Sequence, residues 1–192
     1  MNEVANLCEI VGADITHVRR GIGTDVRIGP SFLFPGVGYG GSCFPKDIRA
    51  LSKTALQNGM NLEIVSAVDR VNNAQKSRLV HKVIEHFGGA GAIKGKRFAL
   101  WGLACKPKTD DMREAPSLTV IKELTDLGAS ICAYDPEAMD VAKKIFAGKD
   151  VDITFAENNY DALKDAHGLL IVTEWNEFRR PNFGKIGQVL KE

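Results

Sequence analysis

The sequence lacks an excess of either charge. Its 25 lysines and arginines face 24 aspartates and glutamates, which leaves a formal net charge of +1. A surface that holds nucleic acid or anionic lipid by bulk charge needs a larger positive excess. The sequence also lacks an apolar run of the roughly 18 residues that cross a bilayer, and the basic start of a signal peptide. We therefore expect a cytoplasmic protein with no nucleic-acid or membrane partner.

Closely spaced metal ligands are also absent. The cysteines form no Cys-x-x-Cys pair, and the histidines show no metal-ligand spacing (Cys8, Cys43, Cys105 and Cys132; His17, His81, His86 and His167). Zinc clusters and disulfide-rich small domains need such spacing. We expect free thiols and no bound metal.

The first half of the chain has helical spacing on both sides of one irregular segment. Apolar periodicity predicts helices over 2–11, over 46–58 and over 62–87, and a short helix that follows Asp14, has Thr16 as a possible N-cap and stops at Gly21. Glycines and prolines between residues 27 and 43 exclude a helix there and predict an ordered loop. The glycine cluster at 88–91 predicts a domain boundary.

The second half alternates short apolar runs with helical patterns. Strands are expected at 97–101, 130–134, 151–154 and 168–172, with helices at 117–127, 137–146 and 160–164 between them. Such alternation predicts a parallel, doubly wound sheet of the Rossmann type. The fold class is therefore α/β, with a helical region (1–91) followed by a Rossmann-like domain (92–192).

One cysteine lies in an unusual context. Cys43 follows two glycines and precedes Pro45, which suits the first turn of a helix. The helix dipole at such a position favours a thiolate, and Lys46 adds a positive charge. Asp47, four residues after Cys43, could place a water or act as a general base. The alternative is a buried, inert cysteine in a glycine-rich turn.

Two long runs carry a family resemblance. Residues 38–47 read Gly-Tyr-Gly-Gly-Ser-Cys-Phe-Pro-Lys-Asp, and residues 102–117 read Gly-Leu-Ala-Cys-Lys-Pro-Lys-Thr-Asp-Asp-Met-Arg-Glu-Ala-Pro-Ser. Both runs resemble the UDP-glucose/GDP-mannose dehydrogenase family, as do residues 19–23 and 27–30. The resemblance covers nearly the whole chain. Within the family, the runs are most similar to members that oxidise UDP-glucose to UDP-glucuronate, with GDP-mannose and UDP-N-acetylhexosamine enzymes as alternatives.

The resemblance implies a mechanism and a set of roles. Family members oxidise a sugar alcohol to a carboxylate in two NAD-dependent steps, through a thiohemiacetal and a thioester on a cysteine. By this likeness Cys43 is the nucleophile and Asp47 activates or places the water, while Lys46 and Arg113 contact NAD. The residues implied to bind substrate are Phe32, Leu33, Phe34, Pro35, Gly36, Gly40 and Lys106, together with Arg27, which would reach the neighbouring subunit of a homodimer.

Several of these residues also have simpler interpretations. Lys106 could be a solvated surface lysine. Asp110 and Asp111 are interpreted as caps at the start of the helix that follows them. Asp135 ends the second strand, where a Rossmann fold holds a ribose, but it also precedes Pro136 and could be a turn residue.

The Gly-x-Gly-x-x-Gly fingerprint of dinucleotide binding is absent from the sequence. In the family, an NAD domain and a Lys-x-x-x-Asn pair precede the segments seen in this chain. We therefore expect a fragment of the enzyme that does not turn over by itself. The other function considered is a non-catalytic module that binds nucleotide and dimerises.

Overall fold

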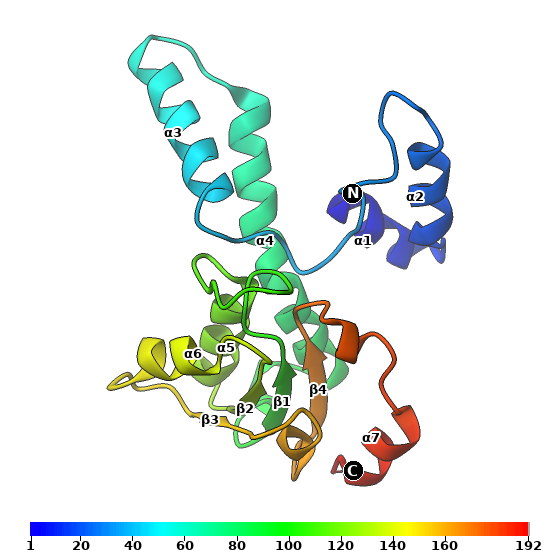
Figure 1. Ribbon diagram of the computed structural model, residues 1–192, viewed down its shortest axis with the longest axis vertical. Coiled ribbons are helices and arrows are strands. Elements are labelled where there is room, and N and C mark those ends of the chain that lie inside the picture. The colour runs from blue at the N-terminus through cyan, green and yellow to red at the C-terminus, as the bar shows by residue number, and fades with distance from the viewer. Residues whose placement is uncertain (192) are drawn as a thin grey trace.

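The computed structural model describes residues 1–191, which form a helical first half and an α/β second half (Figure 1). The helical half contains α1 (Asn2–Val11), α2 (Ile15–Gly23), α3 (Phe44–Gln57) and α4 (Glu63–His86). Residues 24–43 connect α2 to α3 without regular structure, as the glycines and prolines predicted. A 3-10 turn, η1 (Ala90–Ala92), leads into the sheet.

The sheet has four strands: β1 (Arg97–Trp101), β2 (Ser130–Tyr134), β3 (Ile153–Phe155) and β4 (Gly168–Ile171). All pairings are parallel, and the order is β3-β2-β1-β4. The connections between them contain α5 (Pro116–Asp126), α6 (Met139–Phe146) and the 3-10 turn η2 (Asp161–Leu163), and the chain continues through η3 (Asn176–Phe178) and α7 (Phe183–Val189). The predicted α/β class with a parallel Rossmann-like sheet is confirmed.

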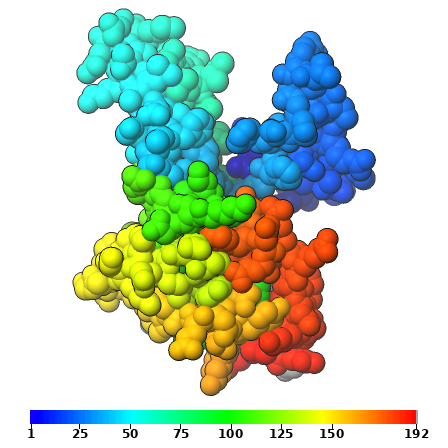
Figure 2. Space-filling model, viewed as in Figure 1, coloured from blue at the N-terminus to red at the C-terminus, as the bar shows by residue number. Residues whose placement is uncertain are grey.

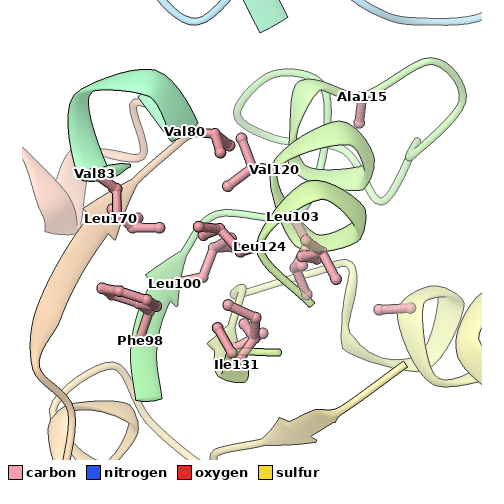
Figure 3. Close-up of a cluster of buried hydrophobic side chains, with 14 of the residues drawn as sticks. Val80, Val83, Phe98, Leu100, Leu103, Ala115, Val120, Leu124, Ile131 and Leu170 are labelled. Atoms are coloured by element: carbon pink, nitrogen blue, oxygen red, sulfur yellow. The ribbon is translucent and has the colours of Figure 1, made fainter. Parts of the chain in front are cut away.

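Side chains alternate between the two faces of β1, so the sheet is buried on both sides. Phe98 and Leu100 pack in a core that α4, α5 and α6 cover, as Figure 3 shows for α4 and α5. Ala99 and Trp101 pack on the opposite face with residues of η2, η3 and α7. Helical or 3-10 segments on both faces make this half doubly wound.

Helix α4 belongs to both halves of the molecule. Its first part pairs with α3 in a hairpin that projects from the sheet (Figures 1 and 2). Its last turns place Val80 and Val83, both buried, in the core beside Leu170 (Figure 3). Each fully buried side chain of this size contributes about 1.5–3 kcal/mol. The two halves are therefore joined by one continuous helix.

Several predicted boundaries differ from the structure. Asp14, and not Thr16, caps α2, because its Oδ1 accepts a hydrogen bond of 2.7 Å from the Thr16 N–H. Helix α2 also continues past Gly21 to Gly23. The helix expected at 160–164 is only the 3-10 turn η2. Within residues 1–191, no helix has the length and apolar composition needed to cross a bilayer.

Candidate active site

Cys43 lies at the start of α3. It is the N-cap residue, and its carbonyl oxygen accepts a hydrogen bond of 2.9 Å from the Asp47 N–H. Pro45 occupies the first turn and is buried. The Cys43 side chain is exposed, with its Sγ 3.6 Å from the Ser42 hydroxyl. The thiol therefore has the solvent access that a nucleophile needs, beside the positive end of a helix dipole.

Buried amide side chains of α4 hold the glycine-rich loop before Cys43. Asn72 accepts a hydrogen bond of 2.8 Å from the Tyr39 N–H and donates one of 3.0 Å to the Tyr39 carbonyl. Gln75 donates to the Gly36 carbonyl at 2.7 Å and accepts from Asn6 at 2.9 Å. A loop whose backbone groups are paired in this way is ordered without a helix or strand of its own.

The same loop touches the second half of the molecule. The Gly41 N–H donates to the Arg113 carbonyl oxygen at 2.7 Å. A Cβ on Gly40 would lie 2.3 Å from the carbonyl oxygen of Glu114, well inside contact distance. Only glycine allows this approach, so the sequence places its two long motifs, around Cys43 and around Arg113, against each other.

Replacing Gly40 with alanine should push these two segments apart. Because the obstructing atom is backbone, we expect a loss of about 1–3 kcal/mol in the free energy of unfolding. Gly36→Ala is the matched control, since a Cβ there meets no atom within 4 Å. Urea titration of both variants measures the difference. Equal stability of the two would contradict the close contact.

The loop that follows β1 is fixed at its base by three side chains. Asp135 Oδ2 accepts from the Leu103 and Ala104 N–H groups at 2.7 and 3.1 Å. Thr173 donates to the Ala104 carbonyl and Ser117 to the Leu103 carbonyl, both at 2.6 Å. These bonds determine where the chain enters the segment that carries Lys106.

Asp135 is a turn residue, which decides between its two interpretations. It is 1% exposed, and its other oxygen accepts from the Glu137 and Ala138 N–H groups at 2.9 Å. The indole N–H of Trp175 completes the set at 3.1 Å. A carboxylate that is buried and engaged by five donors is not available to a ribose.

The predicted capping role of Asp110 and Asp111 is wrong, because Ala115 is the N-cap of α5. Asp111 instead accepts from the Arg113 N–H at 3.0 Å and from its guanidinium at 2.9 and 3.0 Å. The guanidinium bonds hold the pKa of Asp111 below its usual value. Asp111 therefore orients Arg113.

A cavity of about 360 Å³ lies where the two motifs meet. Lys46 and Arg113, both implied to contact the cofactor, line it together with Gly41, Ser42, Arg49 and Glu114. The Arg49 guanidinium lies 2.8 Å from Glu114, and the Lys76 ammonium lies 3.3 Å from it. The hydrogen bond from Arg49, and then that from Lys76, lower the pKa of Glu114. The cavity is rich in cations and suits an anionic ligand.

Other predicted site residues lie elsewhere in the single chain. Phe32 is fully exposed, and Phe34 lies under the Arg19 guanidinium, 4.2 Å from ring centroid to Cζ. Arg27 pairs with Asp25. Pro35 and Gly36 line a second cavity of about 290 Å³ between α1 and α4. Leu33 is half-buried beside Gly23. Lys106 is exposed near Cys105. Thus the structure gathers Lys46 and Arg113 next to Cys43 but leaves Arg27 and Phe32 outside that cavity.

Metal ligands do not cluster in the part of the chain that the structure describes. No three His, Cys, Asp or Glu side chains among residues 1–191 are placed to hold an ion.

Comparison with known proteins identifies the family of the chain. Residues 1–74 match the model of the UDP-glucose/GDP-mannose dehydrogenase family, central domain, and residues 99–192 match that of its UDP binding domain. The chain belongs to this family. The two matched regions are those that meet at the cavity beside Cys43.

Relatives within the family share its sequence over nearly the full chain. UDP-glucose 6-dehydrogenase of Rhizobium meliloti (strain 1021) is 46% identical over 100% of the chain and 42% of the relative. The Pseudomonas aeruginosa enzyme of the same name is also 46% identical, over 97% of the chain and 41% of the relative. The chain therefore spans about two fifths of these relatives.

Solved structures show the same fold. A UDP-glucose dehydrogenase from Pyrobaculum islandicum superposes with a TM-score of 0.88 at 34% identity, over 95% of this chain and 41% of that one. A UDP-D-ManNAc dehydrogenase from Pyrococcus horikoshii gives 0.78 at 22% identity, over 100% and 41%, and supports the fold alone.

The residues of α4 that hold the loops around Cys43 and Glu114 were not singled out from the sequence. Asn72, Gln75 and Lys76 are all buried, although each is polar. Their spacing of three and four places them on one helix face, where they interrupt the apolar side of α4. That interruption was the available signal. Arg49 and Glu114 gave none, because each looks like an ordinary surface charge.

Proposed function

We propose that this chain is the substrate-binding part of an NAD-dependent nucleotide-sugar 6-dehydrogenase and carries its nucleophile. The whole enzyme would oxidise UDP-glucose to UDP-glucuronate in the cytoplasm. Residues 1–91 would form the dimerising region, which includes the glycine-rich loop that ends at Cys43 (the Cys43 loop). Residues 92–192 would form the UDP-sugar domain. The observation that carries the proposal is the contact of the Gly40–Gly41 backbone with Arg113 and Glu114. It joins a helix-start thiol to a cation-lined cavity.

The thiol explains the second oxidation. After the C6 alcohol has become an aldehyde, Cys43 Sγ adds to C6: a C–S bond forms and the aldehyde oxygen takes a proton. Loss of hydride from C6 and of the hydroxyl proton then leaves a thioester. Asp47, exposed one helical turn after Cys43, takes a proton from water as that water attacks C6. The C–S bond breaks, and the thiolate leaves with the carboxylate formed.

The cofactor implied by the family fits the residues present. Lys46 and Arg113 both line the cavity beside Cys43, and two cations suit a diphosphate. Asp111 holds the Arg113 guanidinium in one orientation. When bound, NAD supplies the oxidant for both steps.

The exposed apolar surface of the helical half supports a homodimer. Large apolar side chains are exposed on α1, on the segment after α2, and on α3 and α4 (Ile10, Val26, Phe32, Leu51, Leu56 and Ile64). The elements that carry them, α1 to α4 and the segment after α2, include the two projections that stand away from the sheet in Figures 1 and 2. Surfaces of this kind mark protein–protein contacts, and in a dimer Arg27 would complete the neighbour's site.

Calorimetric titration of the 192-residue chain tests the substrate. We expect UDP-glucose to bind more tightly than UDP-N-acetylglucosamine or GDP-mannose, and no steady reduction of NAD by the isolated chain. Tighter binding of either competitor would assign the chain to that branch of the family. Binding without turnover in the full-length protein would favour a non-catalytic module.

Lys106→Ala should weaken the binding of UDP-glucose by about 10- to 100-fold, because a charge-assisted contact with a diphosphate contributes about 1.5–3 kcal/mol. Lys164→Ala is the matched control, since Lys164 is also exposed but follows η2. The same titration measures both variants. If the two lysine variants bind alike, Lys106 is only a solvated surface residue.

A further inference from the structure

Glu114 stands where three segments of the molecule meet. It directly follows Arg113 in the loop before α5, and its carboxylate contacts Arg49 on α3 at 2.8 Å and Lys76 on α4 at 3.3 Å. Its φ is +55°, a left-handed conformation that costs energy for a residue with a side chain. Such a conformation persists only where the surroundings fix it.

Lys76 makes Glu114 hard to replace. The Lys76 side chain is only 8% exposed. Within residues 1–191, Glu114 is the only carboxylate within 4.0 Å of its ammonium. A buried ammonium without a counter-charge is strongly unfavourable, so the loop that carries Glu114 is held against α4.

The same residue is linked to the Cys43 loop in two ways. Its backbone carbonyl packs on Gly40, and the preceding carbonyl, of Arg113, accepts the Gly41 N–H at 2.7 Å. Through its side chain it holds Arg49, whose Nε also donates to the Pro45 carbonyl at 3.2 Å. Pro45 lies in the first turn of α3, two residues after Cys43.

From these contacts we propose that Glu114 is a positioning residue, which keeps the Cys43 loop in register with the loop that carries Lys106 and Arg113. It acts through Arg49, Lys76 and the Gly40–Gly41 backbone. The inference deepens the proposed function, and its activity readout rests on that function, but its structural readout does not.

Amide exchange followed by NMR on the 192-residue chain tests the structural part. In Glu114→Gln the Gly41 N–H, bonded to Arg113, should exchange about 10-fold faster or more. The Tyr39 N–H, bonded to Asn72 on the same loop, should keep its rate, as should the Leu100 N–H in the sheet. Glu157→Gln removes the same charge at an exposed position after β3 and should change none of the three.

A second variant covers the case in which the unpaired Lys76 unfolds the chain. Glu114→Gln/Lys76→Met removes the buried charge together with its partner, and it should restore folding while leaving Gly41 exchange fast. Unchanged Gly41 exchange in both variants would overturn the proposal. So would equal acceleration of Gly41, Tyr39 and Leu100, which would mean that Glu114 only stabilises the fold.

Turnover of the full-length protein gives the second readout. Glu114→Gln should lower kcat by about 10-fold and leave KM for UDP-glucose nearly unchanged, since misplaced reacting groups slow the chemical step. A higher KM for UDP-glucose with an unchanged kcat would contradict positioning of the thiol. If neither wild type nor variant turns over while the exchange result holds, the proposed function fails and the positioning role stands.

Discussion

Cys43→Ser in the full-length protein should reduce the formation of UDP-glucuronate by about 10³-fold or more, because loss of a covalent nucleophile removes the whole route through it. The first oxidation does not need the thiol. The yield of NADH per UDP-glucose consumed should therefore fall from two towards one, and an aldehyde-reactive hydrazine should trap the intermediate. Anaerobic assays of NADH and of trapped aldehyde measure both quantities.

Cys132→Ala is the control for this experiment, since Cys132 is a buried thiol of β2 that lines neither of the two cavities. Its rate should match that of the wild type. If Cys43→Ser still makes two NADH per sugar at an ordinary rate, then Cys43 is not the nucleophile. The exposed thiol would then be an incidental feature of a glycine-rich turn.

Asp135→Ala should destabilise the sheet domain by about 4 kcal/mol or more, because five donors lose their acceptor at once, three of them in fully buried bonds, and each buried unpaired donor costs about 1–3 kcal/mol. This is a large part of the roughly 5–15 kcal/mol that stabilises a domain. The main-chain groups affected belong to the segments after β1 and β2. Urea unfolding followed by tryptophan fluorescence measures the loss, since Trp101 and Trp175 both lie in this domain.

Asp150→Ala provides the comparison, because Asp150 is exposed in the turn after α6. It should change the free energy of unfolding little. Asp135→Asn should fall between the two, since an amide keeps one acceptor oxygen and adds a donor where a donor is already present. Wild-type stability of Asp135→Ala would show that water replaces the carboxylate.

The parts of this structure that could be predicted depend on neighbours in sequence. The strand around Phe98 and the helix that begins after Cys43 follow from local apolar runs and from Pro45. The strand has the predicted bounds and the helix begins two residues earlier, at Phe44, but the helix predicted at 160–164 is only the 3-10 turn η2. Over so few residues, apolar periodicity does not distinguish a 3-10 turn from a short α-helix.

The parts that could not be predicted depend on contacts between distant residues. Asp135 bonds to residues 32 and 40 positions away, and Lys76 reaches Glu114 across 38 positions. Asp111 resembles a helix cap by its distance from α5, but its partner is the nearby guanidinium of Arg113. A single sequence does not reveal which charged side chains face one another once the helices are packed.

The continuity of α4 limits where a chimaera of two related enzymes can change from one parent sequence to the other. A unit that begins at residue 92 loses Val80 and Val83, and with them part of the cover over Leu170 and the sheet (Figure 3). It also loses Lys76, the buried partner of Glu114. A functional chimaera must therefore cross over before α4, near Leu62, so that the sheet inherits its helix from the same parent. In this molecule the smallest unit that can be exchanged is larger than the sheet domain.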